Sequence, residues 1–126
     1  MAKGFGQEIQ KPSTRVGQLK RKLDGSEDAE LIMMNILEVF TESEFIPDVG
    51  KYYTFIYLPK TPDVMYDEHP LVAVTGVERW GFKGVNFHWG TSRNYTWQEV
   101  AGKLHVVRNN EIEYLRSLPY AKFVTK

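Results

Sequence analysis

The chain has no cysteine among its 126 residues. That absence excludes disulfides, a thiol nucleophile and cysteine-ligated zinc. No apolar run approaches the roughly 20 residues that a membrane-spanning helix needs, and residues 1–10 lack the apolar segment of a secretory signal. The apolar and charged fractions, 42% and 25%, are those of an ordinary globular domain. We therefore expect one intracellular domain that makes no contact with a membrane.

A complete catalytic motif is also missing. No serine stands in a G-x-S-x-G context, and the glycines form no phosphate-binding loop. His69, His88 and His105 lack the H-x-x-x-H or H-E-x-x-H spacing of metal ligands. Asp67 and Glu68 are chain neighbours whose carboxylates should point apart, and Asp67 should accept backbone hydrogen bonds in the turn that follows it. We expect that the protein is not an enzyme and that it has no cofactor and no metal site.

The zero net charge conceals a segregated pattern. Residues 1–24 carry a net charge of +4, residues 25–50 carry −7, and residues 51–126 carry +3. Charge asymmetry of this kind is informative about partners rather than about fold. It suits docking between complementary neighbours.

Residues 1–23 contain three glycines, one proline and few large apolar side chains. They end in a basic run of Lys20, Arg21 and Lys22. Such a composition predicts an extended basic arm that is disordered alone and becomes ordered against a partner. The three basic side chains are therefore candidate partner-binding residues. Residues 24–126 are predicted to form a single α+β domain.

An amphipathic helix is predicted over residues 27–40. The D-x-x-E pattern of Asp24 and Glu27 resembles a capping box at its start. Apolar residues recur at helical spacing, and Leu31 and Met34 widen the apolar surface beyond one packing face. Two interpretations follow: a helix buried between two layers, or a helix whose second apolar face binds a partner subunit. The second makes Leu31 and Met34 candidate partner-binding residues.

Aromatic residues concentrate in the segment that follows. Eleven of the chain's seventeen aromatic residues lie within residues 51–97, and aromatic side chains favour strands and bury large areas. We predict a β core over residues 51–89, in the form of a small, strongly bent antiparallel sheet that is SH3-like or a partly open barrel. A second capping box at Thr96 predicts a short helix to about Leu104, and residues 97–116 should hold two short helices in all, around a possible last strand at residues 105–108.

The tip of the central hairpin carries two candidate contact residues, Trp80 and Phe82, because loops commonly expose function. Arg79 and Lys83 are chain neighbours of these rings, and Arg93 follows in the next predicted segment. Basic side chains can track a phosphate backbone while bases stack on aromatic rings. An alternative function is therefore a small β-barrel module that binds single-stranded nucleic acid.

Four short motifs carry a resemblance to a known group of proteins. They are Y-x-F-x-Y from Tyr53, P-K-T from Pro59, Y-D-x-x-P-L-V from Tyr66, and G-F-x-G-x-N-x-H followed by an aromatic residue from Gly81. The pattern resembles small proteins of large contractile-tailed bacteriophages of the T-even-like group. After the histidine that group continues with a tyrosine–leucine–proline run, where this chain has Trp89, Gly90 and Thr91.

The resemblance implies a virion or assembly protein rather than an enzyme. The protein would then be located in the head, neck, tail or baseplate of a phage particle, and in the host cytoplasm during assembly. Its expected partners are other virion or assembly proteins, with a homo-oligomer possible and nucleic acid a less favoured partner. The mechanism would be protein–protein contact.

Overall fold

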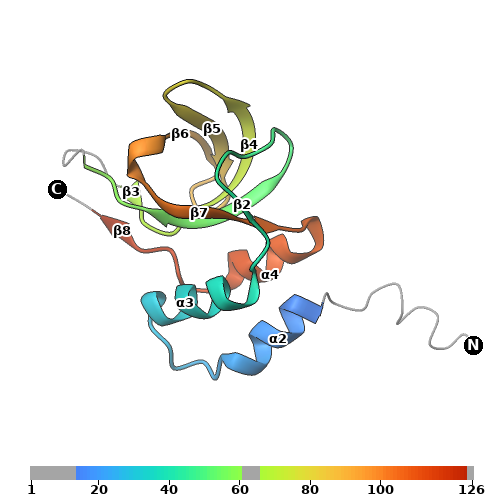
Figure 1. The fold of residues 1–126 in the computed structure, drawn as a ribbon. Coiled ribbons are helices and arrows are strands. Elements are labelled where there is room, and N and C mark those ends of the chain that lie inside the picture. The colour runs from blue at the N-terminus through green and yellow to red at the C-terminus, as the bar shows by residue number, and fades with distance from the viewer. Residues whose placement is uncertain (1–13, 61–65, 125–126) are drawn as a thin grey trace, which may run out of the picture.

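The computed structural model describes residues 14–60 and 66–124, and it places a bent sheet above a layer of helices (Figure 1). The predicted α+β class with a small antiparallel sheet is confirmed. In chain order the elements are α2 (Thr14–Lys22), α3 (Ala29–Val39), β1 (Ser43–Glu44), β2 (Tyr52–Tyr57), β3 (Tyr66–Asp67), β4 (Leu71–Val77), β5 (Gly81–Asn86), β6 (Thr91–Thr96), the 3₁₀ helix η1 (Trp97–Glu99), β7 (Val100–Val107), the 3₁₀ helix η2 (Asn109–Glu111), α4 (Ile112–Ser117) and β8 (Phe123–Val124).

The main sheet has six strands in the order β1-β7-β2-β4-β5-β6, and every neighbouring pair is antiparallel. The sheet is open, with β1 and β6 as its edges. The register shifts between Thr54 and Ile56 and between Val74 and Gly76. Such irregularities bend strands and increase their twist. A separate two-stranded ribbon pairs β3 with β8.

Strand β2 separates two hydrophobic cores. Its alternate residues Tyr53, Phe55 and Tyr57 pack into a strand-side core with residues of β4, β5, β6 and β7. Tyr52 and Ile56 face the other way, into a helix-side core built with α2, α3 and α4. This is the two-residue alternation expected of a strand.

Helix α3 confirms the prediction for residues 27–40 to within two residues at its start and one at its end. Its N-cap is Asp28, whose carboxylate accepts a hydrogen bond from the Leu31 N–H at 2.9 Å. Glu27 instead accepts hydrogen bonds from the backbone N–H groups of Asp24 and Gly25. The acidic side chains therefore close the preceding turn, and the helix is capped at Asp28, four residues after the Asp24 N-cap that the capping-box pattern indicated.

The prediction of an extended arm is wrong for residues 14–22, which form α2; residues 1–13 lie outside the described part of the chain. Two contacts explain the helix. Val16 and Leu19 lie one turn apart and are both buried. Arg15 donates two hydrogen bonds to the fully buried Glu111, from Nε to Oε2 at 3.0 Å and from Nη2 to Oε1 at 2.6 Å. Composition alone cannot show a partner that lies 96 residues away.

The predicted helix from Thr96 to Leu104 is also wrong. Only η1 is helical there, and residues 100–107 form β7, which pairs with both β1 and β2. Gly102 has a φ of 90°, a conformation that an α-helix does not contain. Pairing on two edges outweighs a local capping signal. The second predicted short helix is present as η2 followed by α4.

Candidate contact surfaces

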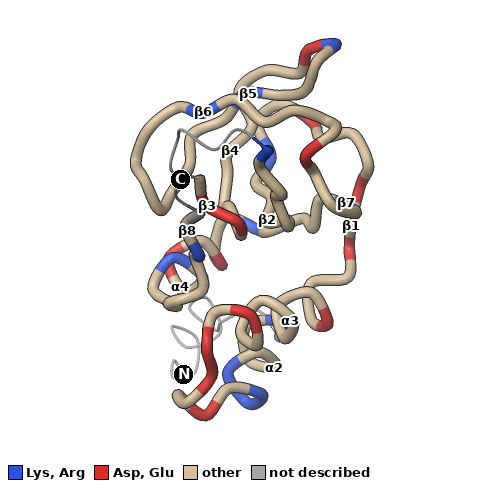
Figure 2. The backbone as a smooth tube through the Cα atoms, turned by 90° about the vertical axis from the view of Figure 1, so that its left-hand side faces the viewer, with Lys and Arg blue, Asp and Glu red and all other residues tan. Residues whose placement is uncertain are grey.

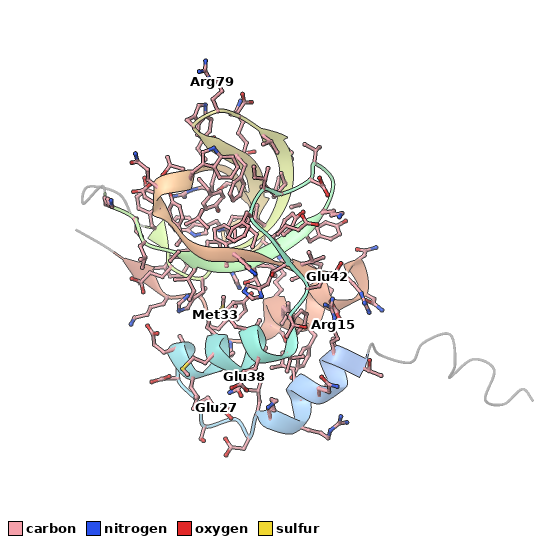
Figure 3. The ribbon with its side chains drawn as sticks, viewed as in Figure 1. Arg15, Glu27, Met33, Glu38, Glu42 and Arg79 are labelled. Carbon is pink, nitrogen blue, oxygen red and sulfur yellow. The ribbon has the colours of Figure 1, made fainter. Side chains whose placement is uncertain are left out.

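Helix α3 presents apolar side chains on two sides. Ile32, Met33 and Ile36 are buried in the helix-side core, and Figure 3 shows Met33 on the side of α3 that faces the sheet. Leu31 and Met34 remain 46% and 59% exposed. Of the two interpretations of this helix, the exposed pair supports the one with a second, outward apolar face.

The basic run at the end of α2 is partly engaged within the chain. Lys20, Arg21 and Lys22 are all exposed. However, Lys22 Nζ lies 3.3 Å from Glu38 Oε1, and Lys20 Nζ lies 5.1 Å from the centre of the Tyr114 ring. Figure 2 shows this basic end of α2 beside the acidic stretch around α3. Part of the basic charge of residues 1–24 is therefore paired with the acidic residues 25–50 within the folded chain.

The hairpin between β4 and β5 separates its two predicted contact residues. Trp80 is exposed in the turn, next to Arg79 at the extremity of the molecule (Figure 3). Phe82 is fully buried: its ring stacks on Tyr95 at 5.3 Å between centroids and meets Phe55 edge-on at 5.6 Å. The prediction that Phe82 contacts a partner is wrong, because two-residue alternation along β5 turns it into the strand-side core.

Two of the three predicted nucleic-acid contacts come together. Lys83 of β5 and Arg93 of β6 line one open pocket of about 320 Å³, whose other lining residues are Tyr66, Thr75, Ser92 and Asn94. The Arg93 guanidinium lies 4.2 Å from the centre of the Trp89 ring and 5.6 Å from that of Tyr66. Arg79 is not among the residues that line this pocket.

An apolar surface that was not predicted from the sequence is more exposed than the pair Leu31 and Met34. Phe45 and Ile46, directly after β1, are 71% and 65% exposed. With Trp97, Val100 and Gly102 they line an open pocket of about 300 Å³, which we call the rim pocket. The signal in the sequence was the adjacent pair of large apolar residues inside the acidic connector over residues 41–50.

Glu99 fixes the wall of the rim pocket. Its carboxylate accepts hydrogen bonds from Tyr57 Oη at 2.7 Å, Thr96 Oγ1 at 2.6 Å and the Lys60 backbone N–H at 2.6 Å. Burial opposes ionisation, yet these hydrogen bonds together hold the pKa of Glu99 below its ordinary value. Burial, reinforced by the bond to Glu99, raises the pKa of Tyr57 to about 12. The network ties η1, and with it Trp97, to the end of β2.

A buried polar cluster lies where β3 meets the β5–β6 turn. Asp67 Oδ1 accepts a hydrogen bond from the His69 backbone N–H at 2.9 Å, which confirms the predicted role of Asp67 in its turn. Its Oδ2 lies 3.1 Å from His88 Nδ1. The His88 ring meets Tyr120 edge-on at 5.1 Å. His88 Nε2 is buried, so a substrate in solvent cannot reach it. The contact between Asp67 and His88 instead joins β3 to the β5–β6 turn.

Comparison with known proteins adds no assignment. No protein-family model matches the chain, and neither the curated proteins nor the solved structures give a match. Within the described residues, no helix is both long enough and apolar enough to cross a membrane.

Proposed function

We propose that this protein is a structural or assembly component of a multi-subunit particle, and that it works through protein–protein contacts. The observation that carries the proposal is the rim pocket, where Phe45 and Ile46 are largely exposed beside Trp97 and Val100. Large apolar side chains grouped on a surface mark sites of interaction. Aromatic anchors in such sites commonly dominate binding energy.

The outward face of α3 supports the same role. Leu31 and Met34 are exposed on a helix whose other side is buried in the helix-side core. Two separate apolar surfaces allow one copy to contact two neighbours. Repeated contacts in a particle add their strengths, so each interface can be modest. The resemblance to contractile-tailed bacteriophage proteins supports a virion as this particle.

The test is retention in purified particles. The double substitution Phe45→Ser with Ile46→Ser should reduce the copy number per particle at least tenfold after a high-salt wash, because salt weakens charged contacts and leaves apolar ones intact. The matched control is Val77→Ser, which removes another exposed apolar side chain at the end of β4. The control should be retained like the wild type.

Equal retention of the double variant and the wild type would contradict the role of the rim pocket. Loss of the wild-type chain itself in the wash would contradict apolar assembly altogether. Circular dichroism in the near ultraviolet checks that each variant keeps its folded core.

Single-stranded nucleic-acid binding is the second candidate, favoured by the pocket that Lys83 and Arg93 share with Tyr66. Two phosphate contacts give a slope of about −1.4 for log affinity against log salt on a single strand. Titration of a labelled 12-nucleotide oligomer should show this slope, and Lys83→Gln should reduce it by about 0.7. A salt-independent or undetectable affinity would eliminate this candidate.

A further inference from the structure

Three potential metal ligands meet beside the start of α3. Glu30 lies in the first turn of that helix, and Glu68 and His69 follow β3. One ligand atom from each of the three lies within 4.8 Å of the other two. Glu30 and Glu68 are 38 residues apart, so no ligand spacing is visible along the chain.

His69 supplies an independent reason to look for a ligand. The residue is only 3% exposed, and both ring nitrogens are buried without a hydrogen-bond partner among the residues that the structure describes. A buried polar group without a partner costs folding free energy. One of these nitrogens lies within 4.8 Å of a carboxylate oxygen of Glu30 and of one of Glu68. A coordinated ion would satisfy that nitrogen.

The loop that carries two of the ligands is held in place by its backbone. The Glu68 N–H donates to the Lys122 carbonyl at 2.7 Å, and the Glu68 carbonyl accepts from the Tyr57 N–H at 2.9 Å. Asp67 holds the next N–H of the loop, that of His69. Ligands on a backbone fixed from several sides lose little freedom when an ion binds.

The local charge also favours a cation. Lys122 Nζ lies 2.8 Å from Glu30 Oε2, so the two side chains form an ion pair. A carboxylate has two oxygens, so Glu30 can keep Lys122 on Oε2 and offer Oε1 to an ion. One lysine beside two carboxylates leaves a net negative charge, because His69 coordinates in its neutral form.

We propose that Glu30, Glu68 and His69 bind a first-row divalent transition-metal ion, with Zn²⁺ as the best match. One imidazole nitrogen and two carboxylate oxygens suit Zn²⁺ better than Mg²⁺ or Ca²⁺, which take oxygen ligands. Bonds of about 2.0–2.2 Å require ligand atoms about 3.3 Å apart. The exposed Glu30 and the half-buried Glu68 move inwards, while the buried His69 stays fixed. The ion joins α3 to the segment that follows β3 and leaves at least one coordination position for water or a partner's side chain.

The experiment measures Zn²⁺ binding to the untagged full chain by competition with a chromogenic chelator. We expect one Zn²⁺ per chain, an affinity reduced at least tenfold by Glu68→Gln and by Glu30→Gln, and a Zn²⁺-dependent rise in melting temperature that Glu68→Gln removes. The matched control is Glu113→Gln on α4, whose side chain is exposed and pairs only weakly with Arg116 at 3.7 Å. It should bind like the wild type.

His69→Ala removes the nitrogen ligand but changes a buried residue, so the two glutamate variants carry the test if that variant does not fold. Absence of stoichiometric Zn²⁺ binding would overturn the proposal. Equal affinities for Glu68→Gln and Glu113→Gln would also overturn it, as would Mg²⁺ or Ca²⁺ competing with Zn²⁺ at equal concentration.

Discussion

The two hydrophobic cores lie on opposite faces of one sheet and are assembled differently. Every buried member of the strand-side core lies within residues 53–106, in strands that follow one another along the chain. The helix-side core joins Leu19 of α2 to Tyr120 near the C-terminal end of the described chain. The strand-side core is therefore a property of one continuous segment, whereas the helix-side core exists only when distant segments meet.

The largest expected effect comes from breaking the strand-side core. Phe55 contacts the rings of Tyr57, Phe82 and Tyr95 and is fully buried. Phe55→Ala should lower the free energy of unfolding by about 3–5 kcal/mol, through lost burial and the cavity left behind. Urea unfolding followed in parallel by far- and near-ultraviolet circular dichroism measures it.

Both signals should shift together in that experiment, because β2 belongs to both cores and links them. Separate transitions for the helical and the aromatic signals would show that the cores fold independently.

A somewhat smaller effect should be confined to the helix-side core. Arg15→Met leaves the buried carboxylate of Glu111 without its bidentate partner and should cost about 3 kcal/mol. Hydrogen exchange should then show lost protection in α2 while the β2–β4 pairing stays protected. The control is Arg116→Met, an exposed arginine paired with Glu113, which should cost less than about 0.5 kcal/mol. Equal costs for the two variants would contradict the anchoring of α2 through Glu111.

Acid should lower the stability of the folded protein through protonation of Glu99. Burial raises the pKa of Glu99, but the hydrogen bonds from Thr96, Lys60 and Tyr57 outweigh it and hold this pKa below its ordinary value in the folded protein. A lowered carboxyl pKa stabilises the folded state above the unfolded value, and the contribution is lost as the pH falls through the folded value. Stability should therefore drop below about pH 4.5, and Glu99→Gln should lose about 1–2 kcal/mol at pH 7 while flattening this acid dependence. Denaturant midpoints between pH 3 and pH 7 test the expectation. A variant with the same steepness as the wild type would assign the acid sensitivity to other carboxyl groups.

The smallest effect separates the two sides of α3. Leu31→Ser changes an exposed side chain and should alter the free energy of unfolding by less than about 0.5 kcal/mol. Ile36→Ala, on the buried side of the same helix, should cost about 2–5 kcal/mol. Thermal melts of the isolated protein compare the two. A large loss for Leu31→Ser would mean that its side chain serves the fold rather than a partner.

The candidate surfaces were only partly predictable from the sequence. Leu31 and Met34 could be identified because helical periodicity assigns each residue to a side of the helix. Phe82 was misassigned because the residue at which the hairpin turns decides which side chains face inwards, and a one-residue error reverses the assignment. The group of Glu30, Glu68 and His69 gave no signal, since its members are adjacent only across the fold.

By itself the sequence determined the α+β class, the alternating faces of β2 and the position of α3, because periodicity and capping act between residues a few positions apart. Tertiary structure decided that residues 14–22 are helical and that residues 100–107 form a strand. In the first case the deciding contact is the pair of Arg15 with Glu111, and in the second it is pairing with β1 and β2. The free energy of these contacts comes from partners far along the chain, so it outweighs local preferences without leaving a local trace.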